Sequence, residues 1–356
     1  MNISDYISPS HKIDNVSDAL DILKKLRKYF DERIQEMYRS YSAYRIGGKL
    51  PFGIWFRGQI REWPLTPAIF RRPDGKVFDE TSIFIHFTAR YPEFSATHRN
   101  SFDWLTLMQH YRTPTRLLDW SESILVALYF AVELTGTRDD SSDGILYVLD
   151  ARRLNEKTIG QSWMKSRERS DVLIRSQMAE ARQTDEWSND IKRLMSQGLV
   201  SHDEYEEIEC KKIDAYCNPI AVYPARLNNR MIFQGSVFTL HGGKVNVYDY
   251  DDPIPEPISI EEVNESSPHK FLTWCKIDAS KKSRIKDELF SIGIHEASLF
   301  PELDRQSNYL KEQWSHDIGP RRSSPQALLK HAGAWEGDDL KELLQEVYAA
   351  RGKIEL

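Results

Sequence analysis

Hydrophobic positions follow two periods along the chain and predict a protein of mixed helices and strands. Apolar side chains recur at helical spacing between residues 17 and 41, where Ser17 is placed to cap the helix. Residues 102–111 have the same period, and residues 280–292 form an amphipathic pattern that Gly293 is placed to end. Residues 81–91 fit both periods, with a helix slightly favoured.

The strand-like segments are short, apolar and bounded by turn residues. They are residues 53–58, 115–120, 144–150 and 271–277, with two or three more strands and a Gly242-Gly243 hairpin turn within 220–250. Residues 124–134 are apolar on nearly every side, which predicts a helix buried all round, with Ser121 as its cap. Residues 338–350 carry one apolar stripe, typical of a helix.

These elements predict one α/β or α+β domain with helical ends. We expect a helical segment at residues 1–49, the main domain at 50–310 and a helical tail at 311–356. Residues 161–216 are highly charged and poor in Gly and Pro. They predict a helical insertion outside the sheet, or a lid.

Composition narrows the setting in which the protein works. A net charge of −6 gives no general attraction to nucleic acid or anionic membranes. Three cysteines without zinc-site spacing favour a reduced, cytoplasmic location. The N-terminal residues lack the pattern of a signal peptide, and the longest apolar run, 124–132, is too short to cross a bilayer. We therefore expect a soluble protein without membrane contact, of undetermined oligomeric state.

The first polar cluster is Arg57-Gly58-Gln59, which follows an apolar pair at the end of a predicted strand. An arginine fork binds phosphate or carboxylate with two hydrogen bonds, and a neighbouring glycine lets the backbone approach the same ligand. The alternative is that Arg57 pairs with a structural carboxylate such as Asp119.

The second cluster lies within residues 109–122. His110 suits a general base or a ligand anchor because its pKa is near neutrality, and the alternative is a half-buried histidine bonded to the backbone. Arg116 and Asp119 are three apart on an extended segment, so they should point to opposite faces. One of them should then serve the scaffold and the other the site. Ser121 would line the site or only cap the next helix.

The third cluster is in residues 229–242, where a strand would place Arg230, Ile232 and Gln234 on one face. Gly235 would then permit a bulge or a close approach by a ligand. Gln234 can offer an amide donor and acceptor to a base edge or a ribose hydroxyl. Its alternative role is an edge-strand glutamine that faces solvent. The phosphate-binding P-loop, the dinucleotide glycine motif, the GxSxG elbow and HExxH are all absent from the sequence.

Taken in order, these strings resemble the FRG domain, a module of bacteria and phages. The resemblance rests on FRGQ at 56–59, MQHYRTPTRLLDWSESILVALYFAV, DGILYVLD, NNRMIFQGSVFTLHG and LFPELDRQSNYL, and it spans about residues 50–310.

A more distant likeness is to ADP-ribosyltransferases, which implies their split β-sheet and an NAD site. Arg57-Gly58 would match the NAD-binding arginine of that family, residues 119–121 its Ser-Thr-Ser motif, and residues 126–131 the helix behind it. The family's catalytic glutamate has no counterpart, because Gln234 lies in that region. A neutral amide gives less electrostatic stabilisation to the cationic centre that forms as nicotinamide leaves.

The two resemblances imply an NAD- or nucleotide-directed effector, an ADP-ribosyltransferase-like toxin in bacterial or phage defence, with NAD as its cofactor. Asp119 or Glu122 would supply the missing carboxylate. The candidate residues are, for catalysis, His110, Asp119 and Gln234 and, for cofactor binding, Arg57, Gly58, Gln59, Tyr111, Arg116 and Ser121, with no metal ligand. We expect Arg57, His110, Asp119 and Gln234 to line one cleft.

Three alternatives stay open at this point. The first is a non-catalytic module that senses a nucleotide or a nucleic-acid end. The second is a metal-dependent nuclease or hydrolase that uses Asp119 and His110. The third is a protein-interaction scaffold with residues 161–216 as its contact surface.

Overall fold

The computed structural model describes residues 1–40, 53–71, 75, 78–98, 100–134, 138–159, 218–242 and 258–315. The chain forms two compact units, Met1–Gln306 and Ser307–Leu356, and everything below concerns the first unless stated. The predicted insertion at 161–216, the strand at 244–250, the second glycine of the predicted hairpin and the tail helix at 338–350 lie outside the described residues.

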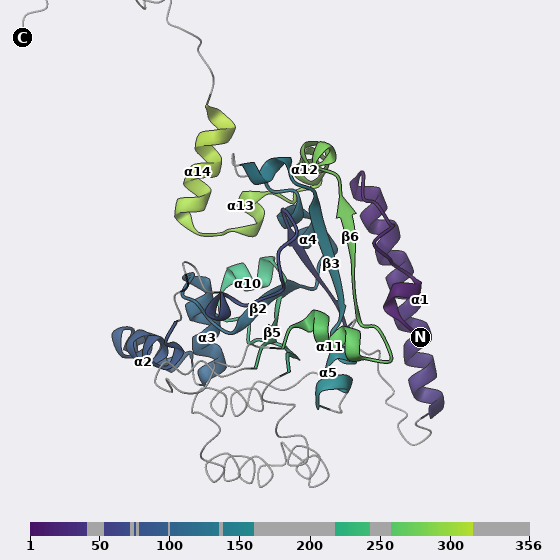
Figure 1. The fold of residues 1–356 in the computed structure, drawn as a ribbon. Helices are drawn as coiled ribbons and strands as arrows, with labels where there is room; N and C mark the ends of the chain where they lie inside the picture. The colour runs from purple at the N-terminus through teal and green to yellow at the C-terminus, as the bar shows by residue number, and fades with distance from the viewer. Residues whose placement is uncertain are drawn as a thin grey trace, which may run out of the picture. The chain divides into compact units, whose positions relative to one another are not determined.

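The described strands form one antiparallel sheet in the order β4-β5-β2-β1-β3-β6 (Figure 1). The mixed α/β class is therefore confirmed, in its α+β form. The strands are β1 (Ile54–Gln59), β2 (Leu117–Ser121), β3 (Gly144–Asp150), β4 (Ile220–Val222), β5 (Ser236–Leu240) and β6 (Leu272–Ile277).

The two halves of the sheet diverge between β1 and β2. β1 pairs with β3 along its whole length, from Ile54 opposite Asp150 to Gln59 opposite Ile145. With β2 it pairs only where Phe56 lies opposite Ser121. The predicted split sheet is thus one continuous sheet with a local opening, and side chains of both strands can reach that opening.

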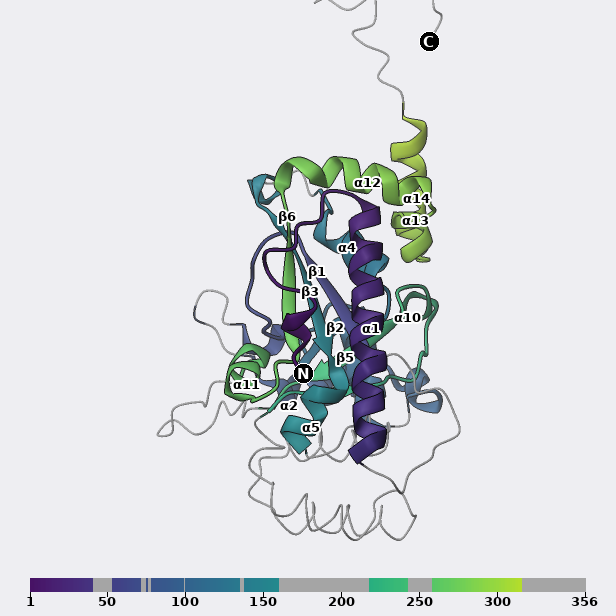
Figure 2. The same ribbon diagram turned by 90° about the vertical axis from the view of Figure 1, so that its right-hand side faces the viewer.

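Helices flank both faces of the sheet. Figure 2 shows α1 running alongside it, with α12 at its upper end. No helix in the described ranges is both long and apolar enough to cross a membrane. The α-helices are α1 (Val16–Ser40), α2 (Glu80–Arg90), α3 (Ser101–His110), α4 (Ile124–Ala131), α5 (Ala151–Ile159), α10 (Asn229–Phe233), α11 (Ile260–Ser266), α12 (Lys282–Ser291), α13 (Glu296–Leu299) and α14 (Leu303–Trp314). The boundary between the two units falls within α14. The 3-10 helices are η1 (Ile3–Asp5), η2 (Ala68–Phe70), η4 (Pro92–Ala96), η5 (Arg138–Ser141) and η6 (Ala279–Lys281).

Strand alternation sends neighbouring side chains of β1 into different cores. Ile54 and Phe56 pack with α1, α4 and α12, whereas Trp55 packs on the opposite face, in the core that includes α5 and α11. A third core lies between α3, α10 and the β2, β4 and β5 half of the sheet. Arg57 follows directly after these anchored residues, so its backbone is fixed by the packing on both faces.

The apolar helix α4 packs directly on β1, as its sequence predicts. A Cβ at Gly58 would lie 1.8 Å from the Ala127 carbonyl oxygen, and a Cβ at Gly144 would lie 2.4 Å from that of Ala131. Gly58 therefore allows α4 to pack closely on β1. Its predicted role beside a ligand stays a prediction. The helix is shorter than predicted, since it ends at Ala131 and Leu134 is exposed.

Most predicted helices are present, but two predicted caps are wrong. Asn15 caps α1 instead of Ser17, because its side chain accepts a hydrogen bond from the Asp18 N–H (3.0 Å). Ser123 caps α4, since β2 continues through Ser121. The undecided segment at 81–91 is the helix α2, and α12 ends before Gly293 as expected.

Residues 229–233 form a helix, where the sequence predicts a strand. Asn228 caps this helix, α10, through its side chain, and Gly235 follows it with a left-handed φ of 55° that suits glycine. Helical spacing buries Met231 and leaves Phe233 exposed, so the strand-face argument for Gln234 does not hold. The strand begins only at Ser236.

Candidate functional site

Two adjoining pockets meet at Arg57. The strand pocket, about 380 Å³, lies at the opening between β1 and β2 and is bounded by α4, the end of α3 and α10. The loop pocket, about 650 Å³, lies beside residues 60–66, which follow β1. Arg57, Gly58 and Phe130 line both pockets, so the two form one two-part cleft around the end of β1.

The strand pocket presents the carboxylate of Asp119, held by a fixed amide. Gln109 donates from Nε2 to Asp119 Oδ2 (2.7 Å), and the Thr115 hydroxyl donates to Gln109 Oε1. Because a carboxylate accepts hydrogen bonds, the Nε2 end of the amide is the one that faces Asp119. The exposed Asp119 side chain is thus oriented before any ligand arrives. The sequence reasoning gave no role to Gln109, although it sits beside His110.

Arg57 crosses the opening between the two strands. Its Nη1 donates to the backbone carbonyl of Asp119 (2.6 Å), and its buried Nε has no hydrogen-bond partner among the described residues. Burial lowers the pKa of Arg57, the Asp119 charge opposes this shift, and the nearby charge of Arg71 adds to it. Burial therefore disfavours the charge of this guanidinium, and some of its N–H donors are unused. A bound anion would stabilise the charge and accept from these donors.

Ser121 and Gln234 form the floor of the strand pocket. The Ser121 hydroxyl donates to the Gln234 carbonyl oxygen (2.6 Å) and ties β2 to the end of α10. The Gln234 Nε2 donates to the Leu299 carbonyl oxygen (3.2 Å). This bond leaves Oε1 as the acceptor that the side chain can offer to a ligand.

His110 and Tyr111 lie outside both pockets. His110 is partly buried, with Nε2 3.7 Å from Glu302 Oε1, and its pKa is lowered by burial and by Arg230, against the effect of Glu302. Tyr111 is 60% exposed and packs edge-on against the His110 ring. Of the four residues expected to converge, Arg57, Asp119 and Gln234 line the strand pocket and His110 does not.

Arg116 belongs to the scaffold. It is fully buried, it pairs with Glu80 of α2, and its Nη1 donates to the His241 carbonyl oxygen (3.2 Å). As expected for positions three apart, Arg116 serves structure while Asp119 faces the site. Glu122 is held by Arg226 and Tyr223 and does not line either pocket, so the carboxylate offered to a ligand is that of Asp119.

Arg112 is a site residue that the sequence reasoning missed. It lines the strand pocket, and it is the one non-glycine residue in the described ranges with a positive φ, 60°. The turn that it forms at the end of α3 matches the turn that Gly293 forms at the end of α12. In each turn the next N–H bonds to the carbonyl oxygen five residues back, from Thr113 to Met108 (2.9 Å) and from Ile294 to Leu289 (2.8 Å). An arginine in a glycine position costs backbone strain, which is typical of functional sites.

Positive charge prevails in the cleft although the chain is acidic overall. Arg57, Arg71, Arg112 and Arg230 line it, against the carboxylates of Asp119 and Glu133. A cleft lined mainly by one sign of charge concentrates ligands of the opposite sign. In the part of the chain that the structure describes, no group of three or more His, Cys, Asp or Glu side chains is placed to hold a metal ion.

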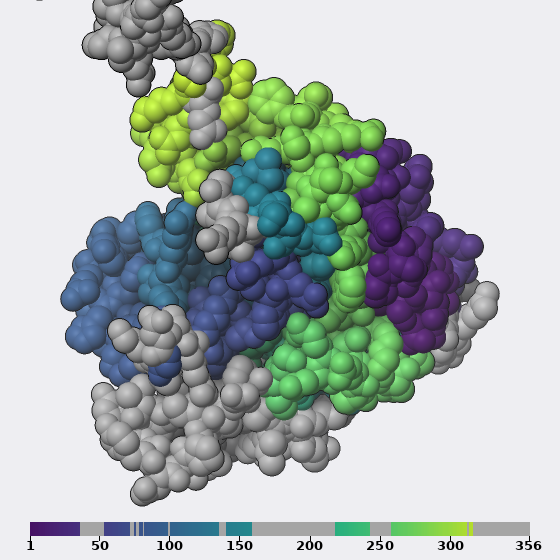
Figure 3. Space-filling model, turned by 45° about the horizontal axis from the view of Figure 1, so that its top comes forward, coloured from purple at the N-terminus to yellow at the C-terminus, as the bar shows by residue number. Residues whose placement is uncertain are grey.

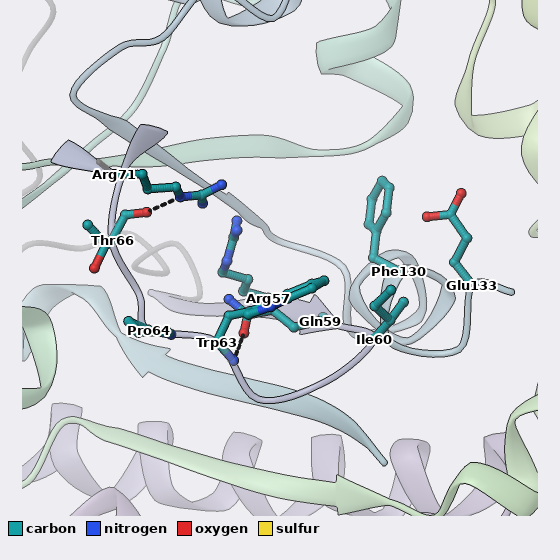
Figure 4. A pocket seen from close by; sticks show the side chains of 10 residues that line it. Arg57, Gln59, Ile60, Trp63, Pro64, Thr66, Arg71, Phe130 and Glu133 are labelled. Atoms are coloured by element: carbon teal, nitrogen blue, oxygen red, sulfur yellow. Dashed lines mark hydrogen bonds between the residues drawn. The ribbon is translucent and has the colours of Figure 1, made fainter. Parts of the chain in front are cut away.

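The loop pocket contains the remaining predicted residue, Gln59. This buried side chain accepts the Trp63 N–H at Oε1 (3.2 Å), so it braces the following loop (Figure 4). In Figure 3 the indigo surface that includes this loop lies between the blue surface of α2 and α3 and green surface from the later part of the chain. The bond from Trp63 to Gln59 therefore braces the loop that forms one wall of the loop pocket.

Comparison with known proteins identifies one family. Residues 53–140 match the family model described as FRG domain. That range contains β1, α3, β2 and α4, and with them Arg57, Gln109 and Asp119 of the cleft. Neither the curated proteins nor the solved structures gave a match to this chain. The chain therefore contains an FRG domain, which carries the central residues of the candidate site.

Proposed function

We propose that the cleft binds NAD or a closely related nucleotide and that the protein is an NAD-directed enzyme of the ADP-ribosyltransferase type, an effector in bacterial or phage defence. The observation that carries the proposal is the position of Arg57. Its partly unsatisfied guanidinium lies where the two pockets meet, next to the oriented carboxylate of Asp119. A phosphate bound there would place the rest of the nucleotide beside Asp119.

The proposed reaction breaks the bond between C1′ of the ribose and the nicotinamide nitrogen. Nicotinamide leaves with the bonding electron pair, and water or an acceptor attacks C1′ and loses a proton. Asp119 would stabilise the positive charge that develops at C1′, because Gln109 already holds its carboxylate in place. Gln234 Oε1 would accept a ribose hydroxyl, since its Nε2 is already held by Leu299.

In this scheme Asp119 of β2 takes the role of the catalytic glutamate of ADP-ribosyltransferases. Gln234 follows α10, outside a strand, and carries no charge. Asp119 lies on β2, the strand that the Ser121–Gln234 hydrogen bond joins to the end of α10. The strand pocket thus contains a carboxylate, that of Asp119, although the position that matches the catalytic glutamate in sequence holds Gln234.

The test is release of nicotinamide from NAD by the purified full-length protein. We expect turnover above the blank, and a loss of about 100-fold or more in Asp119→Asn, the range for removing one electrostatic stabiliser of a transition state. Glu122→Gln is the matched control, because its carboxylate lies outside both pockets, and it should keep its turnover.

Thermal melts with and without NAD complete the experiment. Asp119→Asn should melt close to the wild type and should still be stabilised by NAD. A wild-type protein that is stabilised by NAD but releases no nicotinamide would support the non-catalytic nucleotide sensor instead. An Asp119→Asn variant with unchanged turnover would remove Asp119 from the mechanism.

A further inference from the structure

Two guanidinium groups converge above the loop pocket. Arg57 comes from β1 and Arg71 from the segment after η2, and Figure 4 shows them pointing toward one another. Each donates to one backbone carbonyl, Arg57 to Asp119 (2.6 Å) and Arg71 Nε to Thr66 (3.0 Å). Within the described ranges neither forms an ion pair with a carboxylate, so most of their donors are available to a ligand.

The charge around this arginine pair favours an anion. The positive charge of Arg71 contributes to the lowered pKa of Arg57, after burial and against Asp119. Glu133 also lines the pocket, but Figure 4 shows it beyond Phe130, on the far side from Arg71. Burial raises the pKa of Glu133, and the positive charge of Arg305 opposes this shift. A phosphate between the two arginines would offset their mutual repulsion and could bind both forks.

The wall beside the arginine pair carries an aromatic ring on a braced loop. Trp63 is 36% exposed and lines the pocket, while the Arg61 guanidinium lies 4.9 Å from the centre of its ring. Lys282 Nζ donates to the Ile60 carbonyl oxygen (2.6 Å) and Glu261 Oε1 accepts from the Leu65 N–H (3.1 Å). These bonds, with that from the Trp63 N–H to Gln59, hold the backbone of the loop on both sides of the indole.

We infer that the loop pocket is a nucleoside-phosphate subsite, in which Arg57 and Arg71 hold the phosphate and Trp63 stacks on the base. This inference deepens the proposed function, since it assigns the adenosine phosphate half of the dinucleotide to the loop pocket. Arg57 lines both pockets, so the nicotinamide ribose then extends past it into the strand pocket, toward Asp119. Arg71 and Trp63 become the residues that select a nucleotide.

Binding of ADP and of inorganic pyrophosphate to the full-length protein tests this subsite. ADP carries the base and the phosphates without the nicotinamide half, and pyrophosphate carries neither base nor ribose. Trp63→Ala should weaken ADP binding by roughly 5- to 100-fold, the range for loss of one stacked base, and should leave pyrophosphate binding unchanged. Arg71→Ala should weaken both ligands by about tenfold or more.

Trp314→Ala and Arg284→Ala are the matched controls, because they remove an exposed tryptophan and an exposed arginine elsewhere. Both should bind ADP like the wild type, and melting curves should show all four variants folded.

If the wild type fails to bind ADP, or if neither Trp63→Ala nor Arg71→Ala weakens ADP binding, the subsite is wrong even when NAD is turned over. Conversely, the expected ADP pattern without any NAD turnover would support the subsite and reject the catalytic proposal. Equal loss of pyrophosphate binding in Trp63→Ala would overturn the stacking role.

Discussion

Arg57 and Arg116 show how one residue type serves two purposes in this protein. Arg116 is fully buried and paired with Glu80, so its charge is compensated within the fold. Arg57 has a backbone carbonyl as its partner, and among the described residues its Nε has none and no carboxylate pairs with it. The first arginine holds α2 against the sheet, and the second is available to a ligand.

Substitution of these two arginines should separate the roles. Arg57→Ala strands a carbonyl and no carboxylate, so it should cost only about 1 kcal/mol of unfolding free energy. Arg57→Lys keeps the charge but loses the fork, and it should weaken NAD binding less than Arg57→Ala does. Arg116→Ala leaves the Glu80 charge buried and should cost about 3–5 kcal/mol. Thermal melts with and without NAD measure both effects. A large loss of stability in Arg57→Ala with an unchanged NAD response would place Arg57 in the scaffold.

The left-handed Arg112 predicts a trade-off between stability and binding. Arg112→Gly should raise the unfolding free energy by about 1 kcal/mol, because glycine adopts this φ without strain. It should also weaken NAD binding, because a cation of the strand pocket is lost.

Gly293→Arg is the control, because it places arginine in the equivalent turn of α12, where a Cβ meets no atom within 4 Å. It should lose about 1 kcal/mol by the same backbone effect and bind NAD normally. Denaturant unfolding and calorimetric titration measure these changes, and an unaltered affinity in Arg112→Gly would remove Arg112 from the site.

At the scale of elements, the site depends on how closely α4 packs on the sheet. Gly58 and Gly144, on adjacent strands, each face the backbone of α4 at a distance that excludes a side chain. Val126, Ala127 and Phe130 on this helix form one wall of the strand pocket. The position of α4 therefore sets both the packing of β1 and the width of the pocket.

Gly58→Ala tests this packing. The added methyl would lie 1.8 Å from the Ala127 carbonyl oxygen, so α4 or β1 must move. We expect a loss of about 1–3 kcal/mol or more in unfolding free energy, as in other overpacked cores. Because the same shift changes the strand pocket, NAD affinity should fall together with stability. A variant that melts like the wild type would show that the helix has more freedom than this contact allows.

At the scale of the whole molecule, a buried polar chain links the site to acid stability. The Trp120 indole N–H donates to Thr239 Oγ1 (3.0 Å), which lies 3.0 Å from His241 Nε2. Burial lowers the pKa of His241 to about 3, and the charges of Arg116 and Arg57 add to the shift. The histidine is thus neutral in the fold, and its ring forms a hydrogen bond with the Thr239 hydroxyl.

The pH dependence of stability follows from this lowered pKa. Below about pH 6.5 the unfolded chain binds a proton at His241 that the folded chain does not bind, down to pH values near 3. The stabilising contribution is therefore complete above about pH 6.5 and is lost as pH falls, at about 1.4 kcal/mol per pH unit. His241→Gln removes the titrating group, so its unfolding free energy should fall less between pH 7.5 and pH 5. Urea unfolding at the two pH values gives the difference, and equal losses in both proteins would contradict the assignment.

Local pattern was sufficient for most elements and for the central residues of the site. The strand at Gly144–Asp150, the apolar helix behind the cleft and the glycine that ends α12 follow from spacing and residue type. Arg57 and Asp119 were identifiable because charged residues beside core elements need partners or ligands. The opposite roles of Arg116 and Asp119 follow from strand alternation.

Tertiary structure decided which polar residues share a cleft. Residues 229–233 contain β-branched and aromatic side chains in part, yet the Asn228 cap and the left-handed Gly235 make them a helix. Packing of α4 determined the role of Gly58, and contact with Glu80 removed Arg116 from the candidates. Arg112 and Gln109 joined the site because the end of α3 lies at the opening between β1 and β2. Arg71 joined it because the segment after η2 borders the loop pocket. Such meetings depend on contacts far apart in sequence, and no local period encodes them.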